Sequence, residues 1–294
     1  MARSKILDFI EYIPLRIGVG LVDALPISAA LSCGRGLGRL SWTLLPKRRR
    51  IAIGNVLRSG ITADPIEAER IAKASFLSFG MLAVESLAAS RLIRPETLVE
   101  HVEFCIPAAT RAFIDAPGKG GIYAIPHLGN WEVSAHVISF SKKVVAVARN
   151  LNNHYAQAFM LRRNPRRNMD VVSKHSTDRL SLIRPLKTGA MLGLVCDQHA
   201  SSHGVMAEFF GRPAKTVTSP ARLHLATRAP IICGCCVRTG LMKFKILSSE
   251  PLMYEPTSDR DADVLRITND INRRLEAFIR LYPEQYLWAH RRWR

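Results

Sequence analysis

The sequence lacks the features that mark several protein classes. Its 294 residues contain no low-complexity tract and no internal repeat. Apolar residues make up 48% of the chain, which is enough for a sizeable core. Together these observations exclude a disordered or fibrous protein. A chain of this length is compatible with one large α/β unit.

Acidic residues are scarce relative to basic ones. Asp and Glu number 24 against 42 Lys and Arg, which gives a formal net charge of +18. A field of this sign favours a polyanionic partner, and the two candidates are nucleic acid and an anionic membrane surface. No helix-turn-helix, zinc finger or RNA-binding aromatic motif is present. We therefore expect no nucleic-acid partner and keep a basic nucleic-acid binder as the competing function.

The basic residues occur in clusters at 47–50, 162–167 and 291–294, each beside apolar or aromatic residues. This combination suits the headgroup region of a bilayer, where long cationic side chains reach from an apolar surface to the phosphates. The alternative is that the clusters are solvated faces of ordinary helices.

The N-terminal region lacks a clean membrane span. Within residues 6–46, the longest run without a charge is residues 24–34, whereas a spanning helix needs about 20 apolar residues. Pro14 and Pro26 are expected to break helices, and early acidic residues argue against a cleavable signal peptide. We expect one or two amphipathic helices on the cytoplasmic leaflet, with residues 47–50 at the phosphates. Helices that pack only on the core, or a single span, are the alternatives.

The cysteines form no recognisable metal framework. Cys233 and Cys236 have the spacing of a metal or redox pair, but no second ligand pair accompanies them. We therefore expect buried free thiols of a reducing compartment and no metal site. The six cysteines are Cys33, Cys105, Cys196, Cys233, Cys235 and Cys236.

From about residue 118, strand-like and helix-like segments alternate. This order predicts an α/β fold with a mixed, largely parallel central sheet flanked by helices. The N-terminal third reads as mostly helical, and we place the boundary between a helical membrane-associating region, residues 1–60, and an α/β domain, residues 61–294. The expected strands are 121–126, 143–148, 169–173, 191–196, 231–237 and 243–247. The expected helices are 130–140, 154–163, 177–187, 219–227 and 261–281.

The chemistry-bearing segment is residues 126–132, with the sequence PHLGNWE. It lies between an expected strand and an expected helix, where ligands bind in open α/β sheets. His127 is suited to proton transfer, and Glu132 is expected to bond one imidazole nitrogen and fix its tautomer. Gly129 allows a sharp turn and leaves room for a ligand, while Asn130 is a candidate helix N-cap. Free amides at the helix start are expected to meet an oxyanion or a phosphate.

No serine or cysteine in this segment is placed as a nucleophile. The arrangement therefore favours direct attack by a substrate hydroxyl over a covalent enzyme intermediate. The alternative is structural, with His127 at a helix start and Glu132 as a capping carboxylate.

For Arg149, Asp197 and two tryptophans, the sequence allows two alternative roles. Arg149 follows a strand and would hold a headgroup phosphate or form a surface ion pair. Asp197 follows another strand and would reach the same cleft to bind a sugar hydroxyl or orient a basic residue, unless it is a turn cap. Trp288 and Trp293 are interfacial anchors or core residues, and His290 is expected to be structural.

Residues 127–132 resemble the His-x4-Asp/Glu signature of glycerolipid-type acyltransferases. More closely, they resemble the bacterial lipid A biosynthesis (lauroyl/myristoyl) acyltransferase family. Further blocks of that family match in order along nearly the whole chain: residues 36–55, 149–155, 196–198, 209–221 and 283–292.

The resemblance implies a membrane-associated O-acyltransferase without a cofactor, at the cytoplasmic face of the inner membrane. It implies a donor carried on acyl carrier protein, or acyl-CoA, and an acceptor hydroxyl on a phosphorylated glucosamine lipid. His127 would be the base and Glu132 its partner. The substrate-binding residues implied are Asn130, Arg149, Arg163, Asp197 and Gln198. Residues 199–203 depart from the family pattern, so a different glycolipid or phospholipid acceptor is the alternative.

Overall fold

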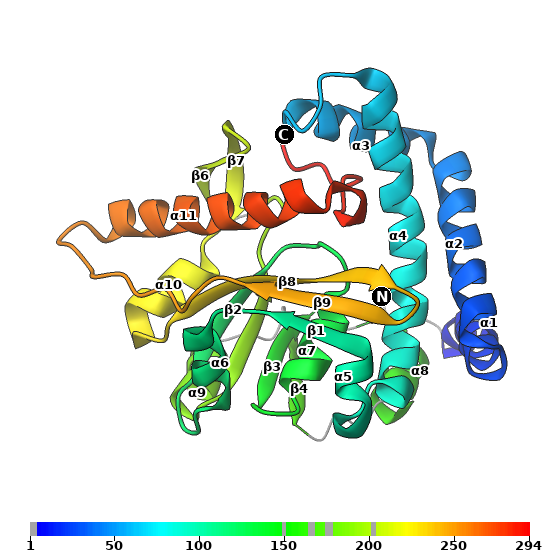
Figure 1. Cartoon of the computed structure of the whole chain (residues 1–294), viewed down its shortest axis with the longest axis horizontal. Coiled ribbons are helices and arrows are strands. Elements are labelled where there is room, and N and C mark those ends of the chain that lie inside the picture. The colour runs from blue at the N-terminus through cyan, green and yellow to red at the C-terminus, as the bar shows by residue number, and fades with distance from the viewer. Residues whose placement is uncertain (1–4, 149–150, 164–167, 174–178, 201–203) are drawn as a thin grey trace.

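The computed structural model describes residues 5–148, 151–163, 168–173, 179–200 and 204–294 (Figure 1). In these residues, seven strands form the central sheet in the order β1-β9-β8-β2-β5-β3-β4. Neighbouring strands are parallel except for β8 and β9, so the expected mixed, largely parallel sheet is confirmed. The strands are β1 (Val102–Cys105), β2 (Gly121–Ile125), β3 (Val144–Ala148), β4 (Met169–Ser173), β5 (Met191–Val195), β8 (Ile231–Gly240) and β9 (Lys243–Ser248).

Helices cover both faces of this sheet, as expected for strands that are apolar on both sides. Alternate residues of β2 point to opposite cores: Ile122 packs toward α10 and α11, whereas Tyr123 packs toward α7. The helices after the first strand are α6 (Ala108–Asp115), α7 (Trp131–Ile138), α8 (His154–Arg163), α9 (Arg179–Lys187), α10 (Ser219–Thr227) and α11 (Arg260–Leu281). The strands and helices expected from residue 118 onward are confirmed to within about three residues.

The described part of the N-terminal third is mostly helical, as expected, and consists of α1 (Lys5–Ala24), α2 (Ile27–Leu44), α3 (Pro46–Arg58) and α4 (Pro65–Leu92). A 3-10 turn (Pro95–Thr97) and the short α5 (Leu98–His101) lead from α4 into β1. A second 3-10 turn (Pro283–Gln285) ends α11 and starts a C-terminal tail, residues 286–294. An antiparallel hairpin of β6 (Gly204–Phe209) and β7 (Arg212–Val217) stands apart from the main sheet.

Proline has different effects at the two expected helix breaks. α2 begins directly after Pro26, which confirms that break, but α1 continues through Pro14, so that expectation is wrong. A proline inside a helix costs roughly 3 kcal/mol. Contacts to α8 lie on both sides of the proline: Tyr12 packs edge-on against Phe159, and Arg16 lies 4.8 Å above the same ring.

Among the described helices, α4 alone has the length and apolar character to cross a bilayer, and half of its most apolar stretch is buried inside the molecule. It stands beside α2 at one edge of the sheet (Figure 1). Glycine allows this close approach: a Cβ at Gly80 would lie 2.1 Å from the carbonyl oxygen of Gly34, and one at Gly38 would lie 2.5 Å from that of Phe76. The two helix backbones are therefore in direct contact.

We expect Gly80→Ala to lower the free energy of unfolding by about 1–3 kcal/mol, because the added methyl group must push α2 away from α4. Gly36→Ala on the outer face of α2 is the matched control, since a Cβ there meets nothing within 4 Å. That control should be neutral or stabilising by up to about 1 kcal/mol. Urea unfolding of both variants measures the difference, and equal effects would contradict the close packing.

Candidate active site

The loop between β2 and α7 carries His127. At Gly129 its backbone takes a left-handed conformation that glycine adopts more easily than other residues. Gly129 has a φ of +60°, and a Cβ there would lie 2.0 Å from the carbonyl oxygen of Cys236 on β8. The glycine is therefore needed for the turn, as expected. The room it leaves is filled by the β8 backbone, so the expected space for a ligand at this position is wrong.

Asn130 is the N-cap of α7, as expected, because its Oδ1 accepts from the backbone N–H of Val133 at 3.1 Å. The side chain is fully buried, and its Nδ2 donates to the carbonyl of Leu82 and to Glu85. The expected substrate contact of Asn130 is therefore wrong, since α4 and α7 use the side chain for their own packing.

Backbone amides of the loop are also engaged. Gly129 N–H donates to the carbonyl of Gln285 at 3.1 Å, and Asn130 N–H donates to that of Cys236 at 2.7 Å. These two amides at the start of α7 therefore hold the loop in place and are not available to an oxyanion.

Glu85 and Arg238 extend the network around Asn130, and sequence reasoning missed both. Glu85 on α4 is fully buried and accepts from the Arg238 guanidinium at both carboxylate oxygens, with Nη2 to Oε2 at 2.9 Å. Arg238 on β8 also donates to the hydroxyl and the carbonyl of Ser78. The sequence did contain a sign of this ion pair. Glu85 is the sole charged residue in positions 74–90, and a carboxylate that is buried in an apolar helix requires a partner.

Asp197 binds the imidazole of His127 directly. His127 follows β2 by two residues, Asp197 follows β5 by two, and the paired strand residues Ile125 and Val195 set these positions opposite each other. Asp197 Oδ1 accepts from Nδ1–H of the imidazole at 2.7 Å, and its Oδ2 accepts from the backbone N–H of His127 at 3.1 Å. Of the roles expected for Asp197, the structure shows contact with a basic residue; the carboxylate does not line the cavity where a sugar hydroxyl would bind.

The carboxyl of Asp197 is held ionised. Burial alone would raise its pKa, but the charge of His127, the two hydrogen bonds from that residue and a hydrogen bond from Tyr286 outweigh burial and hold the pKa below its usual value. An ionised carboxylate only accepts, so Nδ1 of the imidazole carries a hydrogen, and in the neutral imidazole the lone pair is then on Nε2.

Nε2 of His127 faces the site. Gln198 Nε2 donates toward it at 3.3 Å, and the edge of Trp131 packs against the ring with centroids 5.0 Å apart. The imidazole is 19% exposed, whereas the carboxylate of Asp197 is 1% exposed. A ligand can therefore reach Nε2 of His127, whereas the Asp197 carboxylate on the other side of the ring is shielded from solvent.

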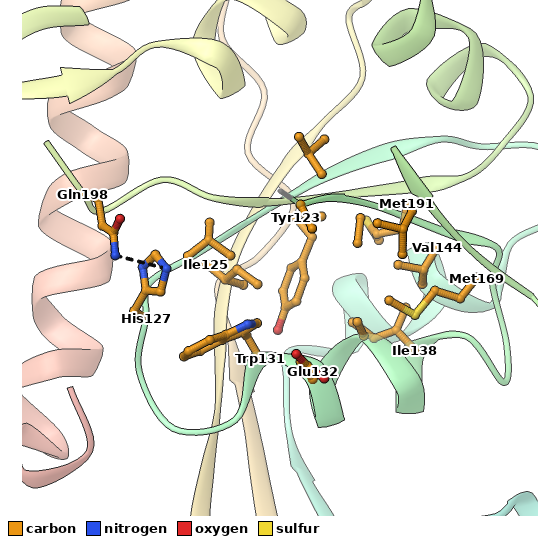
Figure 2. Close-up of a pocket in the computed structure, with 17 residues that line it drawn as sticks. Tyr123, Ile125, His127, Trp131, Glu132, Ile138, Val144, Met169, Met191 and Gln198 are labelled. Atoms are coloured by element: carbon orange, nitrogen blue, oxygen red, sulfur yellow. Dashed lines mark hydrogen bonds between the residues drawn. The ribbon is translucent and has the colours of Figure 1, made fainter. Parts of the chain in front are cut away.

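The expected bond from Glu132 to His127 is replaced by this arrangement, because Asp197 and Gln198 face the two ring nitrogens. α7 begins at Trp131, and its first turn carries Glu132 away from the imidazole (Figure 2). Glu132 instead lines the pocket next to Trp131. Glu132 thus lines the cavity, while Asp197 is the carboxylate that bonds the imidazole.

Two further expectations fall outside what the structure describes. Arg149 lies outside the described residues. Arg163 is the last residue of α8, and its side chain is likewise outside them.

The C-terminal tail packs against the loop that carries His127. Leu287 N–H donates to the carbonyl of His127 at 3.0 Å, and the ring of His290 accepts from the backbone N–H of His199 at 3.2 Å. Burial is the main cause that lowers the pKa of His290 to about 4, so this ring is neutral at pH 7 and structural, as expected. Trp288 is 1% exposed and belongs to the core, whereas Trp293 is partly buried against Phe209.

A cavity of about 330 Å³ extends from His127 into the space between the sheet and α7. Figure 2 shows His127 and Gln198 at one end and Ile138, Val144, Met169 and Met191 at the other. The apolar lining includes Ile125, Ile138, Val144, Met169, Met191 and Val195. A polar, reactive mouth leading to an apolar interior suits a molecule with a reactive head and a hydrocarbon tail.

The cysteines divide into a buried and an exposed group. Cys196, Cys233, Cys235 and Cys236 are buried, as expected, and burial is the main cause that raises the pKa of the Cys233 thiol to about 12. Cys33 and Cys105 are exposed. In the described part of the chain, no group of three His, Cys, Asp or Glu side chains is arranged to hold a metal ion.

Replacing Glu85 by Gln is expected to lower the free energy of unfolding by about 3 kcal/mol, because the Arg238 guanidinium loses its buried counter-charge. Activity should fall in parallel as the loop around Asn130 loosens. Glu67→Gln, which breaks the exposed ion pair of Glu67 with Arg70, is the matched control and should have little effect. Thermal unfolding of the two variants checks this, and a similar stability loss in both would contradict the role of the network.

Comparison with known proteins gives one family. A family model described as bacterial lipid A biosynthesis acyltransferase matches residues 4–294. The fold also resembles the crystal structure of the 1-acyl-sn-glycerophosphate (LPA) acyltransferase PlsC from Thermotoga maritima, with 12% sequence identity and a TM-score of 0.38. That match covers 83% of this chain and 97% of the other. No curated protein sequence matches.

Proposed function

Because the chain belongs to the bacterial lipid A biosynthesis acyltransferase family, we propose that it transfers a fatty acyl chain from a thioester donor to a hydroxyl of a lipid A precursor or a related glycolipid. The donor is an acyl group on acyl carrier protein or on CoA. That the protein is an acyltransferase follows from the family; the donor, the acceptor and the roles of individual residues are the proposal.

The observation that carries the mechanism is the hydrogen bond from His127 Nδ1 to the buried carboxylate of Asp197, which points Nε2, the lone-pair nitrogen of the neutral ring, toward the cavity. The acceptor hydroxyl replaces Gln198 at Nε2 and gives up its proton there as its oxygen attacks the thioester carbon. The imidazolium that forms is stabilised by Asp197. The C–S bond then breaks, the thiolate takes the proton from Nε2, and an ester and a free thiol leave.

Direct transfer of this kind requires both substrates to be held at once. The acyl chain occupies the apolar end of the cavity and its thioester lies at His127, where the side-chain amide of Gln198 is close enough to donate to the carbonyl oxygen. We assign Glu132, on the same cavity wall, to positioning of the substrate.

We further propose that the protein binds the cytoplasmic face of the inner membrane. α1 and α2 expose large apolar side chains at helical spacing, which is typical of helices that lie in a bilayer interface. They are Leu7, Phe9, Ile10, Ile13, Ile17 and Leu21 on α1, and Leu37, Leu40 and Leu44 on α2. Arg35, Arg39 and the basic start of α3 supply the charge that anionic headgroups attract.

His127→Ala and Asp197→Asn test the base and its orienting group. His127→Ala should abolish detectable transfer, and Asp197→Asn should lower kcat by roughly 10²- to 10⁴-fold because the amide no longer fixes the tautomer and leaves the imidazolium unpaired. Asp170→Asn, at an exposed ion pair with Lys143, is the control and should retain activity. Mass spectrometry of the acylated lipid measures transfer, and full activity of His127→Ala would refute the mechanism.

Gly193 offers a test of where the acyl chain lies. It faces the cavity on β5, between Met191 and Val195, and a Cβ there would have no neighbour closer than 3.9 Å. Gly193→Leu should therefore fold but fill the middle of the cavity, lowering kcat/KM for long-chain donors by about fourfold per excluded methylene.

Short-chain donors should be transferred by Gly193→Leu nearly as well as by the wild type, and Gly193→Ala should lie between the two. Thermal unfolding serves as the folding control. An unchanged preference for chain length in Gly193→Leu would place the acyl chain elsewhere.

A further inference from the structure

The chain leaves the central sheet twice at the candidate site, and the C-terminal tail contacts both exits. After β2, the backbone N–H of Leu287 donates to the carbonyl of His127 at 3.0 Å. After β5, the ring of His290 accepts from the backbone N–H of His199 at 3.2 Å. One short segment of the tail therefore spans the two chain segments whose side chains meet at the imidazole.

The segment after β5 is tied down on each side of Gln198. Before it, the carboxylate of Asp197 is bonded to the loop between β2 and α7. After it, the N–H of Ala200 donates to a carbonyl of β7 at 3.1 Å. Between these two lies the bond to His290, at the peptide that joins Gln198 to His199. Holding this peptide fixes the backbone from which the glutamine side chain extends.

Gln198 is the side chain whose direction depends on this peptide. Its Nε2 donates toward Nε2 of His127 at 3.3 Å, and both residues line the cavity (Figure 2). A hydrogen bond of this length is weak, so the imidazole alone does not hold the amide in place. The position of the amide must therefore come from the backbone that carries it.

His290 is suited to accept a hydrogen bond at neutral pH. Burial lowers its pKa to about 4; the charge of Asp197 acts in the opposite direction, and those of Arg292 and Arg294 reinforce the effect of burial. The neutral ring has one lone pair and one N–H, so Nε2 accepts and Nδ1 carries the hydrogen. A protonated ring would present a donor to the peptide N–H, so the bond requires the neutral ring that burial ensures.

The tail that carries His290 is itself fixed by α3 and β7. Asn55 on α3 is buried, and its Nδ2 donates to the carbonyls of Trp288 at 2.8 Å and His290 at 2.6 Å. Arg292 is also buried and donates to the hydroxyl of Thr216 on β7 at 2.7 Å. The tail lies next to α3 (Figure 1). The acceptor ring is therefore anchored on both sides along the chain.

We propose that His290 is a positioning residue: it holds the peptide from which Gln198 extends, and so keeps that amide at the reacting nitrogen of His127. The inference rests on the proposed function, in which this amide donates to the thioester carbonyl oxygen. The ring of His290 lies outside the cavity lining, so it acts through the backbone and not on the substrate. Because an oxyanion donor is effective only at close range, loss of the support lowers kcat. The apolar end of the cavity is unchanged, and with it the KM for the acyl donor.

A mutant cycle with Gln198 tests this role. Gln198→Ala should lower kcat by about 10²-fold. His290→Phe keeps a ring but offers no acceptor, and should lower kcat roughly tenfold with the donor KM changed by less than about twofold. In the Gln198→Ala background, His290→Phe should change kcat by less than about twofold, because the amide that it positions is absent. His290→Gln supplies an accepting oxygen and should recover most of the wild-type kcat.

His101→Phe is the matched control, because it removes a ring bond to the carbonyl of Met242 at 2.8 Å, outside the candidate site. It should change kcat by the same factor with and without Gln198. Multiplicative losses in the His290 cycle, or a His290→Gln variant as impaired as His290→Phe, would overturn the positioning role. Thermal unfolding checks that each variant folds, and His290→Leu gives the same comparison if His290→Phe does not.

Nitrogen-15 NMR of the histidine-labelled protein separates this inference from the function. The Nε2 signal of His127, assigned by its loss in His127→Ala, reports what bonds that nitrogen whether or not acyl groups are transferred. Gln198→Ala and His290→Phe should shift it in the same direction. If no donor supports transfer but both variants shift the signal, the proposed function fails and the positioning role stands. If transfer depends on His127 but His290→Phe leaves the signal and kcat unchanged, the positioning role fails and the function stands.

Discussion

The parallel pairing of β2 with β5 is the constraint on which the geometry of the candidate site depends. The pairing of Ile125 with Val195 fixes the separation of the two chains that leave the sheet there. His127 and Asp197 each lie two residues further on, so the carboxylate meets both the imidazole and the backbone N–H of the same residue. Because the two strands are central and buried, this alignment cannot slip without reversing which side chains face each core.

The loop that carries the histidine is fixed from three further directions. Glu85 of α4 accepts from the side chain of Asn130 in the loop, and the Cys236 carbonyl of β8 accepts from the Asn130 N–H. In the tail, the Gln285 carbonyl accepts from the Gly129 N–H, and the Leu287 N–H donates to the His127 carbonyl. These contacts come from positions between 85 and 287, so the site forms only when most of the chain has folded. Active sites require this kind of fixed support, because small displacements of a reacting group reduce rates strongly.

Much of the fold was predictable because its strands are continuous apolar runs and its later helices have clear periodicity. The hairpin of β6 and β7 was missed, since its turn places Phe210 and Gly211 at φ of +52° and +66°, and a phenylalanine gives no sign of that conformation. The α1 helix was misjudged at Pro14, because contacts with α8 outweigh a local preference. Local sequence does not contain such long-range contacts.

The site was predictable in its residues but not in its pairing. His127, Asp197 and Gln198 were all identified, yet Glu132 was expected on the imidazole because it is near in sequence. The strand order puts β5 next to β2, and this adjacency brings Asp197 closer in space than a residue five positions away. Arg238 was invisible for a similar reason, since its partner lies 153 residues away on α4.

The contact between Gln198 and Nε2 of His127 has a consequence for the resting enzyme. A separation of 3.3 Å is long for a hydrogen bond, so the amide caps the lone pair only weakly. A basic nitrogen left wholly unpaired in a partly dry site would be costly, and one bound tightly would resist exchange. The weak cap avoids both outcomes: in the proposed mechanism the glutamine is a placeholder that the acceptor alcohol displaces at a cost of about 1 kcal/mol.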